Sequence, residues 1–79
     1  TDQLRRRSAA YAYYVLARAG KADLSDLRYF HDALLNDTAS PLAKAHIAAA
    51  LALMGDRARS LNAFEKAAAA LGYQNTGDY

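Results

Sequence analysis

The sequence predicts an all-α fold of four helices arranged as two antiparallel hairpins, and two observations support this fold class. Apolar residues recur at intervals of three and four along most of the chain, and the alternating pattern of a half-buried strand occurs nowhere. Glycine follows the first helix of each pair, at Gly20 and Gly55, where a left-handed residue can end a helix. The polar loop at residues 36–40 separates the two pairs.

The first predicted helix begins behind Asp2, which can cap it, and continues to Ala19, just before Gly20. Leu4, Tyr11 and Val15 share one stripe and set the register of this helix. Several small residues leave room for the close approach of another helix: Ala9, Ala10, Ala12 and Ala17.

The second predicted helix follows the short connection at residues 21–22 and ends near Asn36. Asp23 and Ser25 are alternative caps for its beginning, and the residues alone leave both open. Its inner stripe consists of Leu27, Phe30, His31 and Leu34.

The third predicted helix begins at Pro41 behind a Ser40 cap, a position where the missing N–H of proline costs no hydrogen bond. From Leu42 to Met54 its only polar residues are Lys44 and His46. Because a helix that is apolar nearly all round is typical of a protein interior, we expect this helix to be buried.

The fourth predicted helix begins behind Asp56 and continues to Gly72. We expect one apolar stripe of it to cover the third helix: Leu61, Phe64, Ala68 and Leu71. Polar residues occupy the opposite stripe: Arg59, Asn62 and Lys66. Turn residues after Gly72 predict that the chain continues into further structure: Asn75, Thr76 and Gly77.

Length and composition predict that these helices need neighbouring structure. A chain of 79 residues is at most one small domain, and alone it buries only about 60% of its extended surface. Twenty residues are alanine, which favours helix but contributes little apolar area to a core. There is no cysteine for a disulfide or a thiolate metal site. We therefore expect residues 1–79 to be a partial all-helical domain of a larger protein.

The charge pattern indicates neither a nucleic-acid partner nor a membrane span. The formal net charge is only +2, and basic and acidic residues are interspersed. No apolar run reaches the roughly 18 to 20 residues that span a bilayer, and no signal-peptide pattern opens the chain. The lack of cysteine fits a cytosolic and a periplasmic location equally well.

Two histidines are the first candidates for chemistry. His31 and His46 have no metal-ligand or acid–base partner within a helical turn except Asp32, which lies beside His31 and is expected to face elsewhere. We therefore interpret both as packed histidines or histidines at the rim of the core.

A basic run is the second candidate. The run Arg5–Arg7 precedes three tyrosines in a way that imitates a phosphate-binding surface: Tyr11, Tyr13 and Tyr14. Helical spacing fans the three arginines around most of the axis, so a solvated or ion-paired helix start is the preferred interpretation.

Serines and carboxylates form no catalytic pattern. The serines lie at helix starts or on faces without a histidine close in sequence: Ser8, Ser25, Ser40 and Ser60. Helix capping explains Asp23 and Asp26, which share a face, and Asp32 lies further along the same helix. We predict no catalytic, cofactor-binding or metal-binding residue, no cofactor and no enzymatic activity.

Two long runs nevertheless resemble a known family. The sequence AYAYYVLARAGKADLSDLRYFHDALL at residues 10–35, followed by SPLAKAHIAAALALMGDRARSLNAFEKAAA at residues 40–69, is similar to a stretch of bacterial alpha-2-macroglobulin-like proteins. The most specific pieces are the turn YVLARAGKADL, the helix start DLRYF, the cap SPLAKA and the turn ALALMGDRA, in this order and at this spacing.

This resemblance implies part of the family's thioester-domain region, an alpha/alpha toroid of helix pairs packed around a barrel. Such proteins are broad-range protease inhibitors that act as traps: a protease cuts a bait segment and the molecule rearranges around it. The resemblance implies that target proteases are partners of the parent protein, whose other parts pack on this segment. It also implies a periplasmic location and leaves inner-membrane attachment open. The thioester needs a cysteine, so no functional residue of the family carries over.

Tetratricopeptide repeats are the alternative resemblance. Leu27, Phe30 and Ala33 recur 34 residues later as Leu61, Phe64 and Ala67, the spacing of a repeated helix pair. The sequence departs from that family where small residues are needed for close packing, with Tyr13 at the place of Ala48 and Asp32 at the place of Ala67. This interpretation implies an adaptor that binds short peptides.

Overall fold

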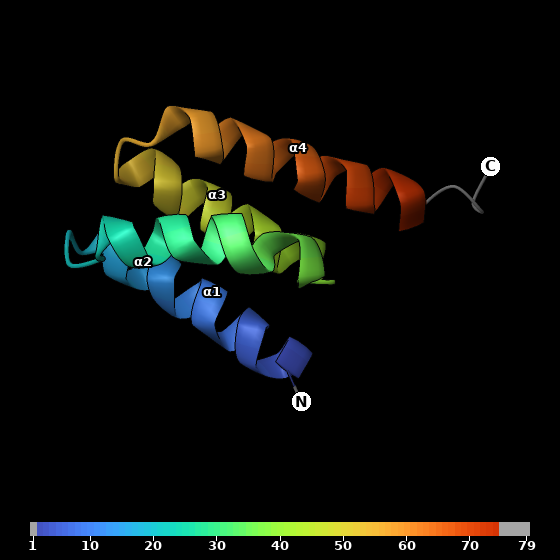
Figure 1. The fold of residues 1–79 in the computed structure, drawn as a ribbon, viewed down its shortest axis with the longest axis horizontal. Helices are drawn as coiled ribbons and strands as arrows, with labels where there is room; N and C mark the ends of the chain where they lie inside the picture. The colour runs from blue at the N-terminus through green and yellow to red at the C-terminus, as the bar shows by residue number, and fades with distance from the viewer. Residues whose placement is uncertain (1, 75–79) are drawn as a thin grey trace.

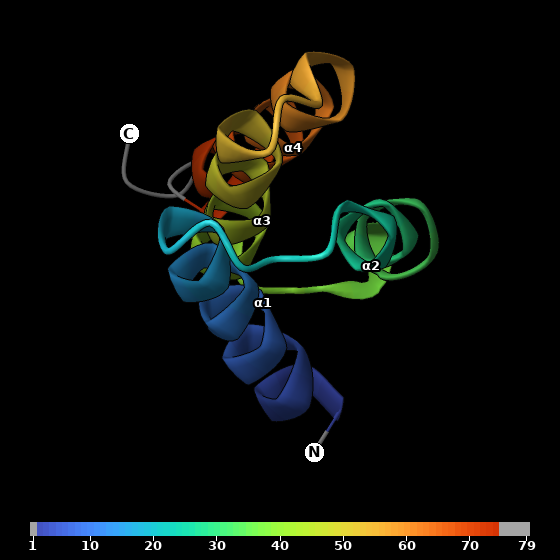
Figure 2. The same cartoon turned by 90° about the vertical axis from the view of Figure 1, so that its left-hand side faces the viewer.

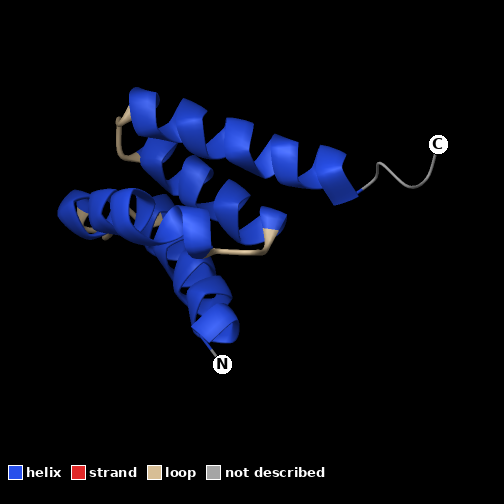
Figure 3. Cartoon of the chain, turned by 45° about the vertical axis from the view of Figure 1, so that its right-hand side comes forward, coloured by secondary structure: helices blue, strands red, loops and turns tan. Residues whose placement is uncertain are grey.

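A computed structural model describes residues 2–74 and contains four helical segments (Figure 1). Helix α1 spans Asp2–Arg18, α2 spans Leu24–Tyr29, α3 spans Pro41–Leu53 and α4 spans Arg57–Gln74. A π-helical turn at Phe30–Leu34 and a 3-10 turn at Leu35–Asp37 continue α2 without a break, and we call residues 24–37 the α2 segment. The described residues contain helix and loop but no strand (Figure 3), which confirms the predicted all-α class.

Helix α3 is the centre of the arrangement and packs against α1 on one flank and α4 on the other. These three helices lie in a row, and the α2 segment lies beside one side of that row (Figure 2). Consecutive helices run in opposite directions within each pair (Figure 1), as the two predicted hairpins require. The chain therefore has one covered side, under the α2 segment, and one side of the row without a covering helix in residues 2–74.

Both predicted glycine turns are present and have the same hydrogen bonds. Gly20 and Gly55 have positive φ angles of 74° and 90°, which glycine adopts without a steric penalty. After α1 the Lys21 N–H donates to the Leu16 carbonyl at 2.8 Å, and after α3 the Asp56 N–H donates to the Leu51 carbonyl at 2.9 Å. These bonds, which span the glycine, close the last turn of each helix as a Schellman motif.

Three side-chain caps fix the helix starts. The Asp23 carboxylate accepts from the Ser25 N–H at 2.8 Å, so Asp23 rather than Ser25 caps α2. The Ser40 hydroxyl accepts from the Ala43 N–H at 3.1 Å ahead of Pro41, as predicted. The Asp56 carboxylate accepts from the Arg59 N–H at 3.2 Å and caps α4.

The core lies where the α2 segment meets the row of helices. Its largest buried apolar side chains are Leu27, Phe30, Leu35, Ile47 and Leu51, with seven buried alanines between them. Leu35 is absent from the predicted stripe, whereas Leu34 on that stripe is only partly buried. The π-helical turn explains this difference, because its extra residue rotates the following side chains and brings Leu35 inward.

Helix α4 is rotated about its axis relative to the prediction. Its expected inner stripe is exposed, with Leu61 at 58% and Phe64 at 44%, whereas Ser60, Ala63 and Ala67 are buried. The Ser60 hydroxyl donates to the Ala48 carbonyl of α3 at 2.8 Å, a bond that requires close approach of the two helices. Small residues therefore make the α3–α4 contact, and the large apolar side chains of α4 remain outside.

The prediction for α1 and α3 also needs correction. The α1 stripe of Leu4, Tyr11 and Val15 is exposed, and Ala10 and Ala17 are the residues that α1 buries. Helix α3 is not buried all round, because Leu42 is 66% exposed and Leu53 is 55% exposed. In both helices the alanine-rich face is the buried one. Three helices pack closely in one row, and small side chains allow this close approach.

At the end of the chain, α4 continues through Gly72 to Gln74 rather than ending at the glycine. The predicted turn residues Asn75, Thr76 and Gly77 lie outside the described residues.

The orientation of α4 predicts different effects for two alanine substitutions on one helix. Ala63→Leu should reduce the free energy of unfolding by roughly 1–3 kcal/mol, because Ala63 is fully buried and a larger side chain forces α3 and α4 apart. Ala68→Leu is the matched control on the exposed stripe and should change it by less than about 0.5 kcal/mol. Urea unfolding followed by circular dichroism measures both. A larger loss for Ala68→Leu would mean that α4 is oriented as the sequence predicts.

Candidate functional site

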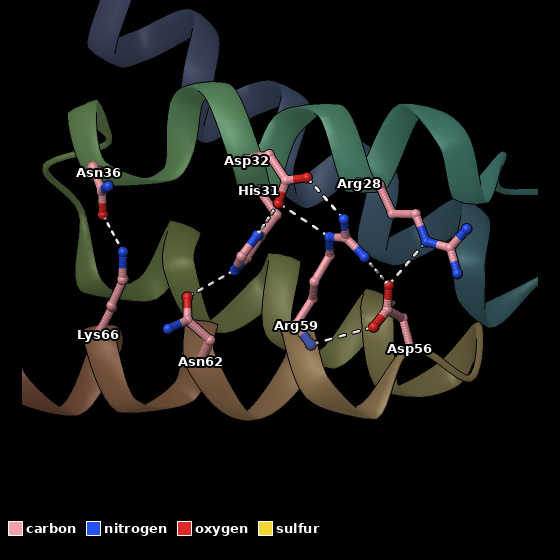
Figure 4. Close-up of polar contacts among 8 residues, drawn as sticks. All are labelled: Arg28, His31, Asp32, Asn36, Asp56, Arg59, Asn62 and Lys66. Carbon is pink, nitrogen blue, oxygen red and sulfur yellow. Dashed lines mark hydrogen bonds and ion pairs between the residues drawn. The ribbon is translucent and has the colours of Figure 1, made fainter.

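A row of polar side chains joins the α2 segment to α4 (Figure 4), and we call it the polar seam. Its members on the α2 segment are Arg28, His31, Asp32 and Asn36. Its members on α4 and its cap are Asp56, Arg59, Asn62 and Lys66. The polar stripe of α4 that the sequence places opposite its apolar stripe therefore binds the α2 segment.

Arg59 lies at the centre of the polar seam. Its Nε and Nη2 donate to the two carboxylate oxygens of Asp32 at 3.0 and 2.8 Å, a bidentate pair. Its Nη1 donates to Asp56 Oδ2 at 3.0 Å, and Arg28 Nε donates to the same oxygen at 2.9 Å. Two arginines and two aspartates from three parts of the chain thus form one continuous network.

The network shifts the pKa of each of its central groups. Hydrogen bonds from Arg59, and then from His31, hold the pKa of the Asp32 carboxyl well below its usual range. The hydrogen bond from Arg28 lowers the pKa of the Asp56 carboxyl, against the opposing effect of burial. The bonds to Asp32 and Asp56 raise the pKa of the Arg59 guanidinium. The partners of Asp32, Asp56 and Arg59 therefore favour the charged form of each of these three groups.

Histidine 31 is held on both sides of its ring. Its Nδ1 lies 2.7 Å from Asp32 Oδ1, so the expectation that Asp32 faces elsewhere is wrong. Its Nε2 lies 2.8 Å from Asn62 Oδ1, and the Lys66 ammonium donates to Asn36 Oδ1 further along. Because both ring nitrogens already have partners, His31 offers no lone pair to a metal ion in this arrangement.

The other histidine, His46, packs among aromatic rings. Tyr11 meets His46 edge to face and Tyr14 stacks on it, each with a centroid distance of 5.4 Å. Ser8 and Ser40 line the same groove between α1 and α3 as His46, a proximity that sequence distance does not reveal. In residues 2–74 the Ser40 hydroxyl accepts from the Ala43 N–H, and no hydrogen bond joins either serine hydroxyl to His46.

The basic run of α1 is spread around the helix, as the spacing predicts. Arg6 Nη1 donates to the Asp37 carbonyl at 3.0 Å, Arg7 lines the groove between α1 and α3, and Arg5 lines a groove between α1 and the α2 segment. Tyr13 is partly buried against Phe30, and its burial, with Asp26 and Asp23 nearby, raises its pKa. These residues do not converge on one phosphate-sized site.

The described residues contain neither a cluster of metal ligands nor a membrane-spanning helix. No group of three or more His, Cys, Asp or Glu residues in that range is arranged to hold a metal ion. Within the same range, no helix combines the length and the apolar character that crossing a bilayer requires.

The uncovered side of the helix row carries most of the exposed large apolar side chains. We call this surface the outer apolar face, and it consists of Leu4, Tyr11, Val15, Leu42, Leu53, Leu61, Phe64 and Leu71. Two grooves connect its parts. One runs between α1 and α3 past Leu4, Tyr11 and Leu42, and the other runs between α3 and α4 past Leu61 and Phe64.

The contacts of the α2 segment show that the residues of the outer apolar face lie on the side of the helix row that points away from the α2 segment. Helix α4 contacts the α2 segment through Arg59, Asn62 and Lys66, which helical geometry places opposite Leu61 and Phe64. Helix α1 contacts the α2 segment through Arg6 and Tyr13. Helical geometry places these two residues opposite Leu4, Tyr11 and Val15. The polar seam and the outer apolar face are therefore the two sides of one layer.

Comparison with known proteins gives no match to this chain. No family model matches it, and neither a curated protein nor a solved structure is significantly similar.

The polar seam predicts a loss of stability in acid. Because the pKa values of Asp32 and Asp56 are lower in the folded chain than the usual value near 4, their stabilisation is complete above about pH 4. It is lost progressively as the pH falls below that value towards the folded pKa. The urea midpoint, measured from pH 7 down to pH 2, should fall over this window.

A double-mutant cycle isolates the central pair. Asp32→Asn and Arg59→Gln should each lower the midpoint at pH 7 and reduce its acid dependence, and the double variant should lose less than the sum. Salt should shrink this coupling because Asp32 is 54% exposed. Additive losses would show that the Asp32–Arg59 pair does not hold the α2 segment to α4.

Proposed function

We propose that this chain is a non-catalytic helical wall of a bacterial alpha-2-macroglobulin-like protease trap, within the alpha/alpha toroid of that family. The observation that carries this proposal is the outer apolar face, which the sequence-level resemblance explains as a surface awaiting neighbouring helix pairs. The two hairpins supply the structural unit from which such a toroid is built.

The energetics of the outer apolar face favour a covering structure. Monomeric proteins rarely expose large contiguous apolar patches, and those that do usually bind something there. Eight large apolar side chains of this face are between 44% and 66% exposed. Burying the exposed half of each would contribute roughly 1 kcal/mol per side chain, a substantial amount for a small helical unit. The rest of the parent chain is the proposed source of that cover.

The polar groups support a structural role. The charged side chains with the most perturbed pKa values belong to the polar seam, where each has a partner that explains its position. In this proposal the seam keeps the α2 segment on the helix row while the parent molecule rearranges. Target proteases meet the parent protein elsewhere, and the parent's location is periplasmic, with attachment to the inner membrane left open.

An adaptor built of tetratricopeptide-like repeats is the second candidate. The side-by-side packing of α1 and α3, the first helices of the two pairs, favours it because repeat arrays stack in this way (Figure 2). In such an adaptor the outer apolar face would bind short peptides. The sequence of the parent gene distinguishes the two proposed functions. A trap requires beta-rich domains upstream of this segment, and an adaptor requires further helix pairs of constant length.

The trap function predicts inhibition by the parent protein and none by this chain alone. After incubation with a broad-specificity protease, the full-length protein should be cut in one exposed segment and should reduce digestion of a large protein substrate. The 79-residue chain is the control and should have no effect. Gel analysis of the cut and a fluorescent casein assay measure both properties. Uncut full-length protein, or unchanged digestion of casein, would contradict the trap and favour the adaptor.

A further inference from the structure

The outer apolar face has a positive rim. Arg7 lines the groove between α1 and α3, and Arg57 lines the groove between α3 and α4. Arg18 lies over the Tyr14 ring at 5.8 Å, at the same side of α1 as Tyr11. Neither groove has an aspartate or a glutamate in its lining, and the acidic residue beside the α4 stripe is Glu65, one helical turn after Leu61. The cations that flank this apolar surface therefore have no carboxylate beside them in the grooves.

The shape of the outer apolar face is suited to binding a helix. The two grooves have volumes of about 310 and 470 Å³ and lie on either side of the ridge formed by the exposed part of α3. Leu42 and Leu53 stand on that ridge, and Ala52 and Gly55 form the low wall of the second groove. Rows of side chains three and four residues apart on a partner helix fit grooves of this kind.

We propose that the outer apolar face docks an amphipathic helix of the larger polypeptide, whose apolar stripe is flanked by Asp or Glu residues that pair with Arg7 and Arg57. This inference rests on the proposed function, because that function requires a neighbouring helix, and it adds the charge that this helix carries. The apolar contacts supply affinity, and the two arginines select the partner and its direction.

Two other occupants fit the face less well. A second copy would bring one positive rim against another, since every charged residue that lines the grooves is an arginine. An anionic bilayer would meet a grooved surface with only Arg7, Arg18 and Arg57 near it, too few cations for strong electrostatic attachment at about 1 kcal/mol each.

A pair of synthetic helices tests the proposal. Both are fluorescein-labelled peptides of about 18 residues with leucine at helical spacing, one with glutamates beside the leucines and its twin with lysines. Fluorescence anisotropy with the 79-residue chain should give at least about tenfold tighter binding for the glutamate peptide at low salt. Added salt should reduce this preference.

Charge-reversal variants locate the binding. Arg7→Glu and Arg57→Glu should each weaken binding of the glutamate peptide by about tenfold and improve binding of the lysine peptide. Arg5→Glu is the matched control, because Arg5 lies in the groove between α1 and the α2 segment, away from the outer apolar face. Circular dichroism of each variant confirms that the helices are retained.

The outcomes separate this inference from the proposed function. Equal affinity for both peptides would overturn the inference that the partner helix is acidic. It would still support the outer apolar face as a surface that binds a helix. Dimerisation in sedimentation equilibrium without peptide binding, or binding to phosphatidylglycerol vesicles in place of the glutamate peptide, would replace the proposed occupant. A monomer that binds neither peptide nor vesicle would overturn both the docking helix and the role of the face in the proposed function.

Discussion

The bidentate pair between Arg59 and Asp32 sets the orientation of α4, and much of the structure depends on that orientation. The pair joins residues 27 positions apart and belongs to a network that also includes Asp56 and Arg28. Beside it, the Ser60 hydroxyl bonds the Ala48 carbonyl, which draws α4 close to α3 along a surface of small side chains. Charge pairing on one side and close packing in the middle leave only the third side of α4 for its large apolar residues.

This arrangement gives the molecule two chemically different sides. On the side of the α2 segment, polar groups are paired and the core of Leu27, Phe30 and Leu35 is enclosed. On the other side, leucines and aromatic rings from three helices surround two grooves with arginine at their rims. A surface of this composition is suited to binding a helix, which is the physical basis of the proposed docking.

Local signals in the sequence predict both glycine turns and the start of α3, although α4 continues past the predicted end at Gly72. Gly20 and Gly55 end helices because only glycine enters the left-handed region freely, and Ser40 with Pro41 begins one because each suits a single position. The direction in which a helix faces is a different problem. The usual assumption that the largest apolar stripe is buried fails for α1 and α4, because alanines and Ser60 give a closer contact than leucines do. Pairing of Arg59 with Asp32 is a long-range contact without a local signal, and the π-helical turn that buries Leu35 also has none.

The two phenylalanines of the chain give the most direct test of this inverted packing, because they have the same intrinsic reactivity and opposite environments. Phe30, on the buried face of the α2 segment, is 3% exposed, and Phe64 is 44% exposed on the outer apolar face. Hydroxyl-radical footprinting of the 79-residue chain, read by mass spectrometry, should show rapid oxidation of Phe64 and strong protection of Phe30. Protection of Phe64 equal to that of Phe30 in the monomeric chain would place the large apolar stripe of α4 inside, and the outer apolar face would not exist.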